Sequence, residues 1–501
     1  MEASQEESGT SPQPVKLKPH QCFVRCCCLF FNVLSGLVNG YDICISAGIL
    51  DDIDRDLELC QAGGQIATCL LKEGVMSFAS MGSLLAKIFC VFVSDKLGRR
   101  IALLLADILI LVSVALQSTT RSVPNFFIAR VLVGMGMGIA FVVTPTYLCE
   151  IAPQAQRGLF VCLNEVAICI GCLVGLSVSS HAEGRWEWQT LISFAALPAA
   201  VQLVFVCALP ESPRWFAMRG NTAGLDRSVS LLGLESETTD LRKLTEKGEA
   251  VSRTDTSCCW HHVAKWKEFR RPFLTVLGVA SCNSATGTVA VQSYAYDLFK
   301  VCGIEEPLRI LPIIGWMKLL GALLAMSMSD GKLLGRRRLV IMGSAMCTLC
   351  DIVVAIHLAM PGFLSAWVAA SSILLRIFSW NAGYGGVQFV TISEILPSEV
   401  RSSFVGQSSI LASFIDILIF QLFETLLFAN KVATFAIFAA LNMGSCLFAV
   451  HFLPDLRGVS LENIWAEKGR GRPYNVLEET GVDAEAKATG LEPSTIGVRV
   501  A

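Results

Sequence analysis

Long apolar stretches separated by short polar runs dominate the hydrophobic pattern of this chain. We locate twelve such stretches, each close to the roughly 20 residues that a helix needs to cross the hydrocarbon core of a bilayer. They cover residues 26–50, 73–94, 101–118, 124–148, 159–180, 188–209, 272–297, 310–329, 339–360, 364–392, 403–427 and 432–453. The pattern predicts an all-α, polytopic membrane protein with twelve transmembrane helices.

Polar segments divide these spans into two sets of six. We expect an N-terminal tail at 1–25, six spans at 26–209, a cytoplasmic loop at 210–271, six spans at 272–453 and a C-terminal tail at 454–501. Amphipathic stretches in the loop predict short helices that lie against the inner membrane face. The tail is rich in Glu, Gly, Ala and Thr, which predicts disorder over most of its length.

Composition agrees with a membrane protein, because 53% of the residues are hydrophobic and only 16% are charged, against about 25% in soluble domains. Lys and Arg gather in the segments that share one side of the membrane when both termini are cytoplasmic, as the positive-inside rule requires. We therefore expect a multi-pass protein, most simply of the plasma membrane, with both termini cytoplasmic.

Several classes of function find no support in the sequence. The net charge of −2 and the lack of a basic tract argue against a nucleic-acid partner. No nucleophile–base set and no phosphate-binding glycine loop stands out, so we expect neither an enzyme nor a cofactor. Cysteines in the run 258–262 match no zinc-ligand spacing. Cys60 and Cys69 share the first outer loop, and whether they pair stays open.

A set of charged motifs occurs twice, once in each set of spans. Asp95-Lys-Leu-Gly-Arg-Arg100 returns at residues 330–338, and Glu150 with Arg157 returns as Glu394 with Arg401. Internal repeats in an apolar chain are typical of transporters whose solute site lies near the bilayer midplane between two halves. The repeats predict two pseudo-symmetric six-helix bundles that move a small solute, with the monomer as the functional unit.

The same motifs predict a cytoplasmic gate. Arginine side chains at helix ends can pair with carboxylates of neighbouring helices while the inner mouth is shut, and separate when it opens. The predicted gate residues are Asp95, Arg99, Arg100, Glu150, Arg157, Glu211, Arg214, Asp330, Arg336, Arg337, Glu394 and Arg401. Positive-inside charge alone is the alternative, and the doubled spacing of Glu and Arg argues against it.

Four motifs in order resemble the sugar porter family of the major facilitator superfamily. They are Gly40-Tyr-Asp42, the run Arg130–Gly138, Pro145–Glu150 with Arg157-Gly158, and Pro210-Glu-Ser-Pro-Arg-Trp215. The resemblance covers about residues 26–458. It implies two six-helix bundles, alternating access, and one central path for a small polar solute.

Asp42 and Arg130 are charged residues inside predicted spans, where a charge normally has a partner or an aqueous cavity. At a rise of about 1.5 Å per residue, the two residues lie at matching depths. In proton-coupled members of the family an Asp and an Arg at matching positions form a pair. The resemblance therefore implies that Asp42 carries the proton, because Arg does not deprotonate usefully. A static ion pair is the alternative.

The positions that match the family's solute site depart from its pattern. Asn-Gln of the fifth span reads Asn164-Glu165, an eighth-span Asn is matched by Lys318, and the tenth-span Trp is matched by Phe389. The predicted solute-binding residues are Glu165, Asn283, Ser284, Gly287, Lys318, Asn381 and Phe389. Charges in place of amides indicate a direct Glu165–Lys318 pair or a charged ligand, unless the eighth span is misaligned by a turn. Asp351 and Arg376 are expected to pair structurally.

The leading interpretation is a proton-coupled symporter that moves a hexose or a related polyol by alternating access. A second interpretation keeps the fold and changes the solute to a charged organic molecule, because organic-ion carriers share the Pro-Glu-Ser-Pro-Arg-Trp motif. A non-transporting nutrient sensor is a third and weaker possibility, since such sensors tend to have a longer cytoplasmic extension than residues 454–501.

Overall fold

The structure is a computed structural model that describes residues 18–59, 66–153, 157–182, 185–235, 266–328, 335–395 and 401–454, with a few residues between 238 and 245. Most of the two predicted tails, part of the central loop and the Cys258–His262 run lie outside the described residues, as do Cys60 and the side chain of Cys69. The described part is helical, apart from one isolated bridge between Pro361 and Leu364.

In the N-terminal half, eight described helices cover the first six predicted spans. They are α1 (Pro19–Gly48), α2 (Leu50–Leu57), α3 (Ile66–Leu97), α4 (Arg99–Thr119), α5 (Val123–Ile151), α6 (Arg157–Ala182), α7 (Trp188–Ser193) and α8 (Ala196–Val206). Two short helices follow in the predicted loop, α9 (Pro213–Met218) and α10 (Thr222–Leu232).

The C-terminal half repeats this arrangement with more interruptions. Its elements are α13 (Trp266–Ala285), α14 (Thr288–Ser293), α15 (Ala295–Val301), η3 (Pro307–Arg309), α16 (Leu311–Met328), α17 (Gly335–Ala359), α18 (Ala366–Trp380), η4 (Asn381–Gly385), α19 (Gly386–Ile395), α20 (Arg401–Ala429) and α21 (Lys431–Phe452). Each of the twelve predicted spans coincides with one helix or with a broken helix.

Ten helical segments of the described chain are long and apolar enough to cross a membrane. The other two predicted spans correspond to α3, which carries Glu73, Lys87 and Asp95, and to the tenth span, which is broken into α18, η4 and α19. Large apolar side chains such as Leu197 (72% exposed) and Val204 (67% exposed) cover the outside of the bundle, as expected for a lipid-facing surface.

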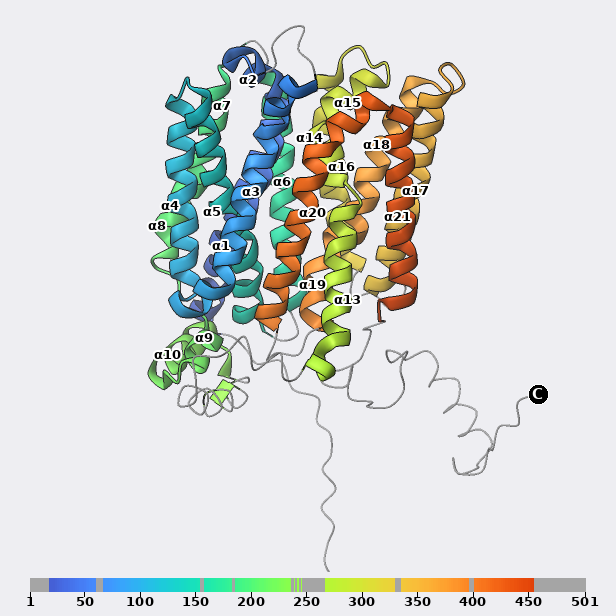
Figure 1. Cartoon of the computed structure of the whole chain (residues 1–501). Helices are drawn as coiled ribbons and strands as arrows, with labels where there is room; N and C mark the ends of the chain where they lie inside the picture. Colours follow the sequence, from blue (N-terminus) through green and yellow to red (C-terminus); the bar gives the residue numbers. More distant parts are fainter. Residues whose placement is uncertain are drawn as a thin grey trace, which may run out of the picture.

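The helices form two bundles that stand side by side (Figure 1). Within the first bundle α1 packs on α6 and α3 packs on α5, and within the second α17 packs on α21. The bundles meet along two seams, where α3 contacts α20 and α6 contacts α16. Helices α2, α7 and α15 lie at one end, called here the α2 end, and α9 and α10 lie beyond the opposite α10 end.

Glycine permits the close packing of α5 on α3. A Cβ atom at Gly134 would lie 1.9 Å from the carbonyl oxygen of Ala79, and one at Gly138 would lie 2.6 Å from that of Ser83. The Gly134–Gly138 run is therefore a helix-contact motif of the kind found in membrane bundles, as its place inside a span predicts.

Candidate solute cavity and helix-end charge cluster

A cavity of about 210 Å³ lies between the two bundles, and residues of both bundles line it. Five of the seven predicted solute-binding residues are among its lining residues, as are Asp42 and Arg130. Those five are Glu165, Asn283, Ser284, Lys318 and Phe389. The sequence repeat predicted a cavity at the interface between the two halves, as is typical of transporters built from repeats; that this cavity holds the solute stays a prediction.

Asp42 of α1 and Arg130 of α5 form a buried ion pair at the cavity wall. Arg130 Nη1 lies 3.1 Å from Asp42 Oδ2, and both residues are 1% exposed. The same Nη1 donates to Ser46 Oγ at 3.1 Å, and Arg130 Nε donates to the backbone oxygen of Val75 at 2.9 Å. The guanidinium therefore joins α1, α3 and α5, so a change of charge at Asp42 would be felt by three helices.

Lys87 of α3 and Asp416 of α20 are two further charged residues of the cavity, to which the sequence analysis assigned no role. Lys87 Nζ donates to Ser413 Oγ at 2.7 Å and stands 4.4 Å from the centre of the Phe141 ring. An ionisable residue inside a predicted span was the available signal for both, because such residues normally face a cavity.

Glu165 of α6 and Lys318 of α16 face each other across the second seam but are not in contact. Among the described residues, no ion pair within 4.0 Å and no hydrogen bond joins them, and the Nζ of Lys318 donates instead to Cys172 Sγ at 3.3 Å. The Glu165 carboxylate has no hydrogen-bond donor in the described part of the chain, although only 9% of the residue is exposed. Of the expected arrangements, the direct pair is therefore not the one observed.

Amide and aromatic side chains complete the cavity wall. Asn283 donates to Gln388 Oε1, while the buried Oδ1 of Asn283 and Nε1 of Trp380 lack partners among the described residues. Phe389 packs edge-on against Phe141, with ring centres 5.0 Å apart. These groups provide a mostly apolar wall with a few polar side chains, which is the usual character of a small-molecule site.

Gly287 and Asn381 do not line the cavity, which corrects their predicted place in the solute site. Gly287 has a φ of 66° between α13 and α14, and a Cβ atom there would lie 2.1 Å from Phe438. Asn381 instead donates to the carbonyl oxygen of Ile377, one turn earlier. Sequence matching cannot distinguish a polar residue at a helix break from one that faces a ligand.

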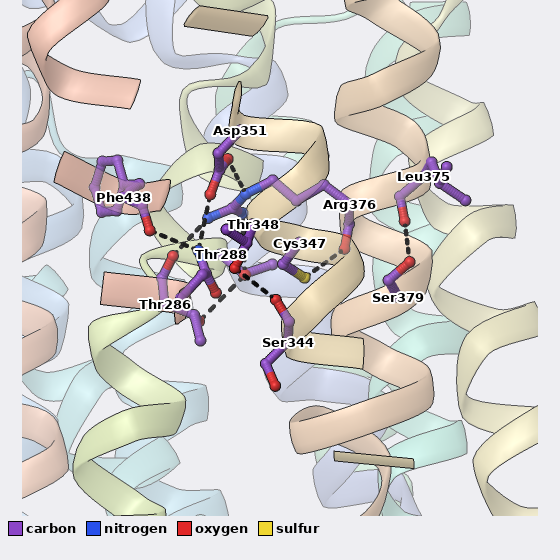
Figure 2. A network of polar contacts seen from close by, with 11 residues as sticks. Thr286, Thr288, Ser344, Cys347, Thr348, Asp351, Leu375, Arg376, Ser379 and Phe438 are labelled. Atoms are coloured by element: carbon purple, nitrogen blue, oxygen red, sulfur yellow. Dashed lines mark hydrogen bonds and ion pairs between the residues drawn. The ribbon is translucent and has the colours of Figure 1, made fainter. Parts of the chain in front are cut away.

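Asp351 of α17 and Arg376 of α18 form the expected structural pair, with Nε and Oδ1 2.6 Å apart and both residues fully buried. Figure 2 shows that the guanidinium also reaches the break between α13 and α14, where it donates to Thr288 Oγ1 at 3.0 Å and to the carbonyl oxygen of Thr286. Asn442 of α21 donates to Asp351 Oδ2 at 2.8 Å. This network fixes the broken helix to its three neighbours.

A charge cluster at the α10 end contains several predicted gate residues. Arg99 makes a bidentate contact with Glu150, at 3.1 Å from Nε and 3.0 Å from Nη2. Among the described ion pairs within 4.0 Å, none joins Glu211 to an arginine; Glu211 instead accepts from the backbone N–H groups of Arg99 and Arg100, at 3.0 and 3.1 Å. It therefore caps the first turn of α4, where a carboxylate is favoured. Burial raises the pKa of the Glu211 carboxyl, while three backbone N–H groups lower it.

The remaining gate residues are placed less fully. The side chain of Arg100 donates to the backbone oxygen of Cys207, and that of Arg337 donates to the backbone oxygen of Val450 at 2.6 Å. Arg214 and Arg336 lie on described helices, with intermediate exposure. The side chains of Asp95, Arg157, Glu394 and Arg401, and the whole of Asp330, lie outside the described residues. Pairing between the two repeated sets therefore stays a prediction.

Comparison with known proteins agrees with this architecture. The family model described as "Sugar (and other) transporter" matches residues 27–467. The chain belongs to this family of membrane transporters, so it is not an enzyme. The fold is that of the major facilitator superfamily, with its two six-helix bundles.

Curated relatives and solved structures cover most of the chain. The glucose transporter GlcP of Staphylococcus epidermidis is 27% identical over 466 residues, covering 91% of this chain and 98% of GlcP. The galactose-proton symporter of Escherichia coli is 27% identical over 456 residues, covering 88% and 94%. The proton:xylose symporter XylE bound to 6-bromo-6-deoxy-D-glucose superposes with a TM-score of 0.77 at 21% identity, covering 89% of this chain and all of that chain.

Proposed function

We propose that this transporter moves a hexose or a related polyol together with protons, by alternating access of the central cavity to the two sides of the membrane. The observation that carries the proposal is the Asp42–Arg130 ion pair, buried in the wall of a cavity between two repeated bundles. Protonation of Asp42 would remove the ionic contact between Arg130 and α1, leaving only the hydrogen bond to Ser46, and so alter the packing of three helices. This is a direct way to link a proton to a conformational change.

Three further points support this solute class. Of the similar proteins, GlcP is named as a glucose transporter, the Escherichia coli protein as a galactose-proton symporter, and XylE as a proton:xylose symporter. A cavity of about 210 Å³ is smaller than the roughly 300–1,000 Å³ of sites for drug-sized ligands. The lining residues Asn283, Ser284 and Gln388 carry both hydrogen-bond donors and acceptors, which suits hydroxyl groups.

In this proposal the α10 end faces the cytoplasm, as the distribution of Lys and Arg favours. The Arg99–Glu150 contact and the Glu211 cap then lie at the inner mouth. The residues of the inner gate hold the helix ends together at this mouth. The functional unit is the monomer, in the plasma membrane.

The experiment is uptake into proteoliposomes of labelled glucose, galactose, xylose and myo-inositol, with and without an inward proton gradient. We expect at least one of these solutes to accumulate above its outside concentration only when the gradient is present. Uptake that merely equilibrates would refute coupling, and no uptake of any of the four would refute the solute class.

A charged organic solute is the second candidate, and a specific feature of the cavity favours it. Glu165, Lys318, Lys87 and Asp416 all line the cavity without an ion pair within 4.0 Å among the described residues. A buried charge that lacks direct contact with an opposite charge is costly, so a solute that carries charge would stabilise the loaded state. One solved structure of this fold is a human organic anion transporter, with a TM-score of 0.58.

The Glu165→Gln/Lys318→Asn double variant separates the two candidates. If the charges recognise a charged solute, the double variant loses that solute and gains uptake of a neutral sugar. If the charges of Glu165 and Lys318 only compensate each other, each single variant is impaired more than the double variant, because a single change leaves one uncompensated buried charge. Wild-type rate and selectivity in the double variant would show that neither residue lines the solute path.

A further inference from the structure

Glu73, near the start of α3, is a buried carboxylate that joins the two bundles at the α2 end. Its Oε2 accepts from Gln421 Nε2 at 2.9 Å and its Oε1 accepts from Thr425 Oγ1 at 3.1 Å. Both partners belong to α20 of the other bundle, and Glu73 is only 2% exposed. The residue is outside the solute cavity and has no role in the mechanism described so far.

The contact is a small ladder between two helices. Ser77 lies one turn after Glu73 on α3 and donates to Gln421 Oε1 at 3.1 Å, while Thr425 lies one turn after Gln421 on α20. Four polar side chains therefore meet face to face across the seam. Such a ladder can exist only while α3 and α20 are in contact at this end. Its hydrogen bonds therefore form when the α2 end closes and break when it opens.

Other charged groups around Glu73 already have partners. Lys72, the preceding residue, contacts Asp51 of α2 at 2.7 Å and Asp297 of α15 at 3.8 Å. Arg130 is paired with Asp42 and also donates to the backbone oxygen of Val75, two residues after Glu73. Among the described ion pairs within 4.0 Å, none includes Glu73.

The two partners of Glu73 are neutral, so they satisfy a carboxylic acid as well as a carboxylate. In the acid the O–H donates to Thr425 Oγ1, and the carbonyl oxygen still accepts from Gln421. An ionised carboxylate held only by neutral groups in a membrane interior is costly, whereas one that faces water is not. Opening the α2 end would expose Glu73 to water, and closing it would bury the group again.

We propose that Glu73 takes up a proton as the α2 end closes, so that closure at this end depends on the pH of the solution it faces. The proton comes from a hydronium ion, which is left as water, and the acid form persists while α3 and α20 are in contact. This inference rests on the proposed alternating access, but not on the identity of the solute or on Asp42. It makes Glu73 a second proton-linked residue, which positions the two bundles and does not touch the solute.

Hydrogen–deuterium exchange of the solute-free protein in nanodiscs tests the proposal, with exchange times corrected for the intrinsic effect of pH. In the wild type we expect amide protection around residues 66–80 to fall about tenfold as the pH rises through a single proton step. Glu73→Gln keeps the shape and the hydrogen-bonding capacity without the charge, so its protection should stay high at every pH.

Three variants serve as controls. Ser77→Ala removes one hydrogen bond of the ladder and leaves the carboxyl group, so its pH step should persist. Asp42→Asn should also keep the step. Thr425→Val removes a hydrogen bond donated to the Glu73 carboxylate, which favours the ionised form, so its step should move to higher pH. A step that persists in Glu73→Gln, or no step in the wild type, would overturn the proposal, whatever solute uptake shows.

Discussion

At the scale of single residues, the ionised side chains inside the bundles fall into two kinds. Arg130 and Arg376 each contact a carboxylate directly and have further hydrogen bonds to neighbouring helices. Glu165 and Lys318 line the cavity with no direct partner of opposite charge among the described residues. The first kind holds helices together, whereas the second has capacity left for a solute, because its charges remain to be compensated.

The Asp351–Arg376 pair allows a direct test of the first kind. Asp351→Asn leaves the fully buried guanidinium without a counter-charge, so we expect a loss of about 3–5 kcal/mol of stability. The unfolding midpoint of the purified protein in detergent measures it.

Asp226→Asn is the matched control, because its pair with Arg242 has side chains 53% and 62% exposed. An exposed pair contributes about 0–1 kcal/mol, so this midpoint should barely move. Equal shifts in the two variants would contradict the structural role assigned to Arg376.

At the scale of helices, breaks and caps at α14 and α4 depend on particular residues. Gly287 precedes α14 with a φ of 66°, a conformation that favours glycine, and the side chain of Phe438 occupies the space where a Cβ atom would lie. Glu211 caps α4 from a distant part of the chain, through the backbone N–H groups of Arg99 and Arg100. Both features determine where a membrane-spanning helix starts.

Gly287→Ala should reduce the yield of folded protein and lower its unfolding midpoint, because it combines an unfavourable φ with a steric clash. Adding Phe438→Leu should restore part of the loss, since only the clash is relieved. Gly444→Ala is the control, because a Cβ atom at Gly444 would meet nothing within 4 Å. A wild-type midpoint for Gly287→Ala would show that α13 and α14 do not require the break.

Glu211→Gln should lower stability by about 1–2 kcal/mol, because one amide oxygen cannot replace two carboxylate oxygens as the cap. The pKa of Glu211 is raised in the folded protein by burial, so the folded state binds this proton more tightly than the unfolded chain. Stability from this group therefore falls as the pH rises through the ordinary glutamate value and the raised value. Glu211→Gln has no group that titrates at this position. Its unfolding midpoint should therefore change less than that of the wild type across this pH range.

The sequence predicted helices better than it predicted the contacts of single side chains. Twelve apolar stretches and a doubled motif set were enough for the two bundles, because span length and repetition are properties of the chain itself. The Asp42–Arg130 contact was also predicted, since buried charges seek partners. The α3–α20 ladder was missed, because Gln421 and Thr425 have no pattern that reveals which helix they face.

At the scale of the whole molecule, two bundles enclose a cavity and meet along the α3–α20 and α6–α16 seams. Each seam carries polar contacts at or near the cavity, so separation at either end must break them and re-form them later. Such an arrangement suits two discrete states better than a continuous movement. The proposed cycle therefore assigns the proton step to residues that contact several helices at once, with Asp42 as the central one.

The most direct test of this account is solute-induced alkalinisation of a weakly buffered solution outside proteoliposomes, recorded with whichever panel sugar the protein transports. The wild type should raise the outside pH as the sugar enters, because each solute takes a proton with it. Asp42→Asn should exchange labelled for unlabelled sugar yet cause no alkalinisation, since Arg130 can no longer be released by protonation. Alkalinisation that persists in Asp42→Asn, or none in the wild type during uptake, would contradict the account.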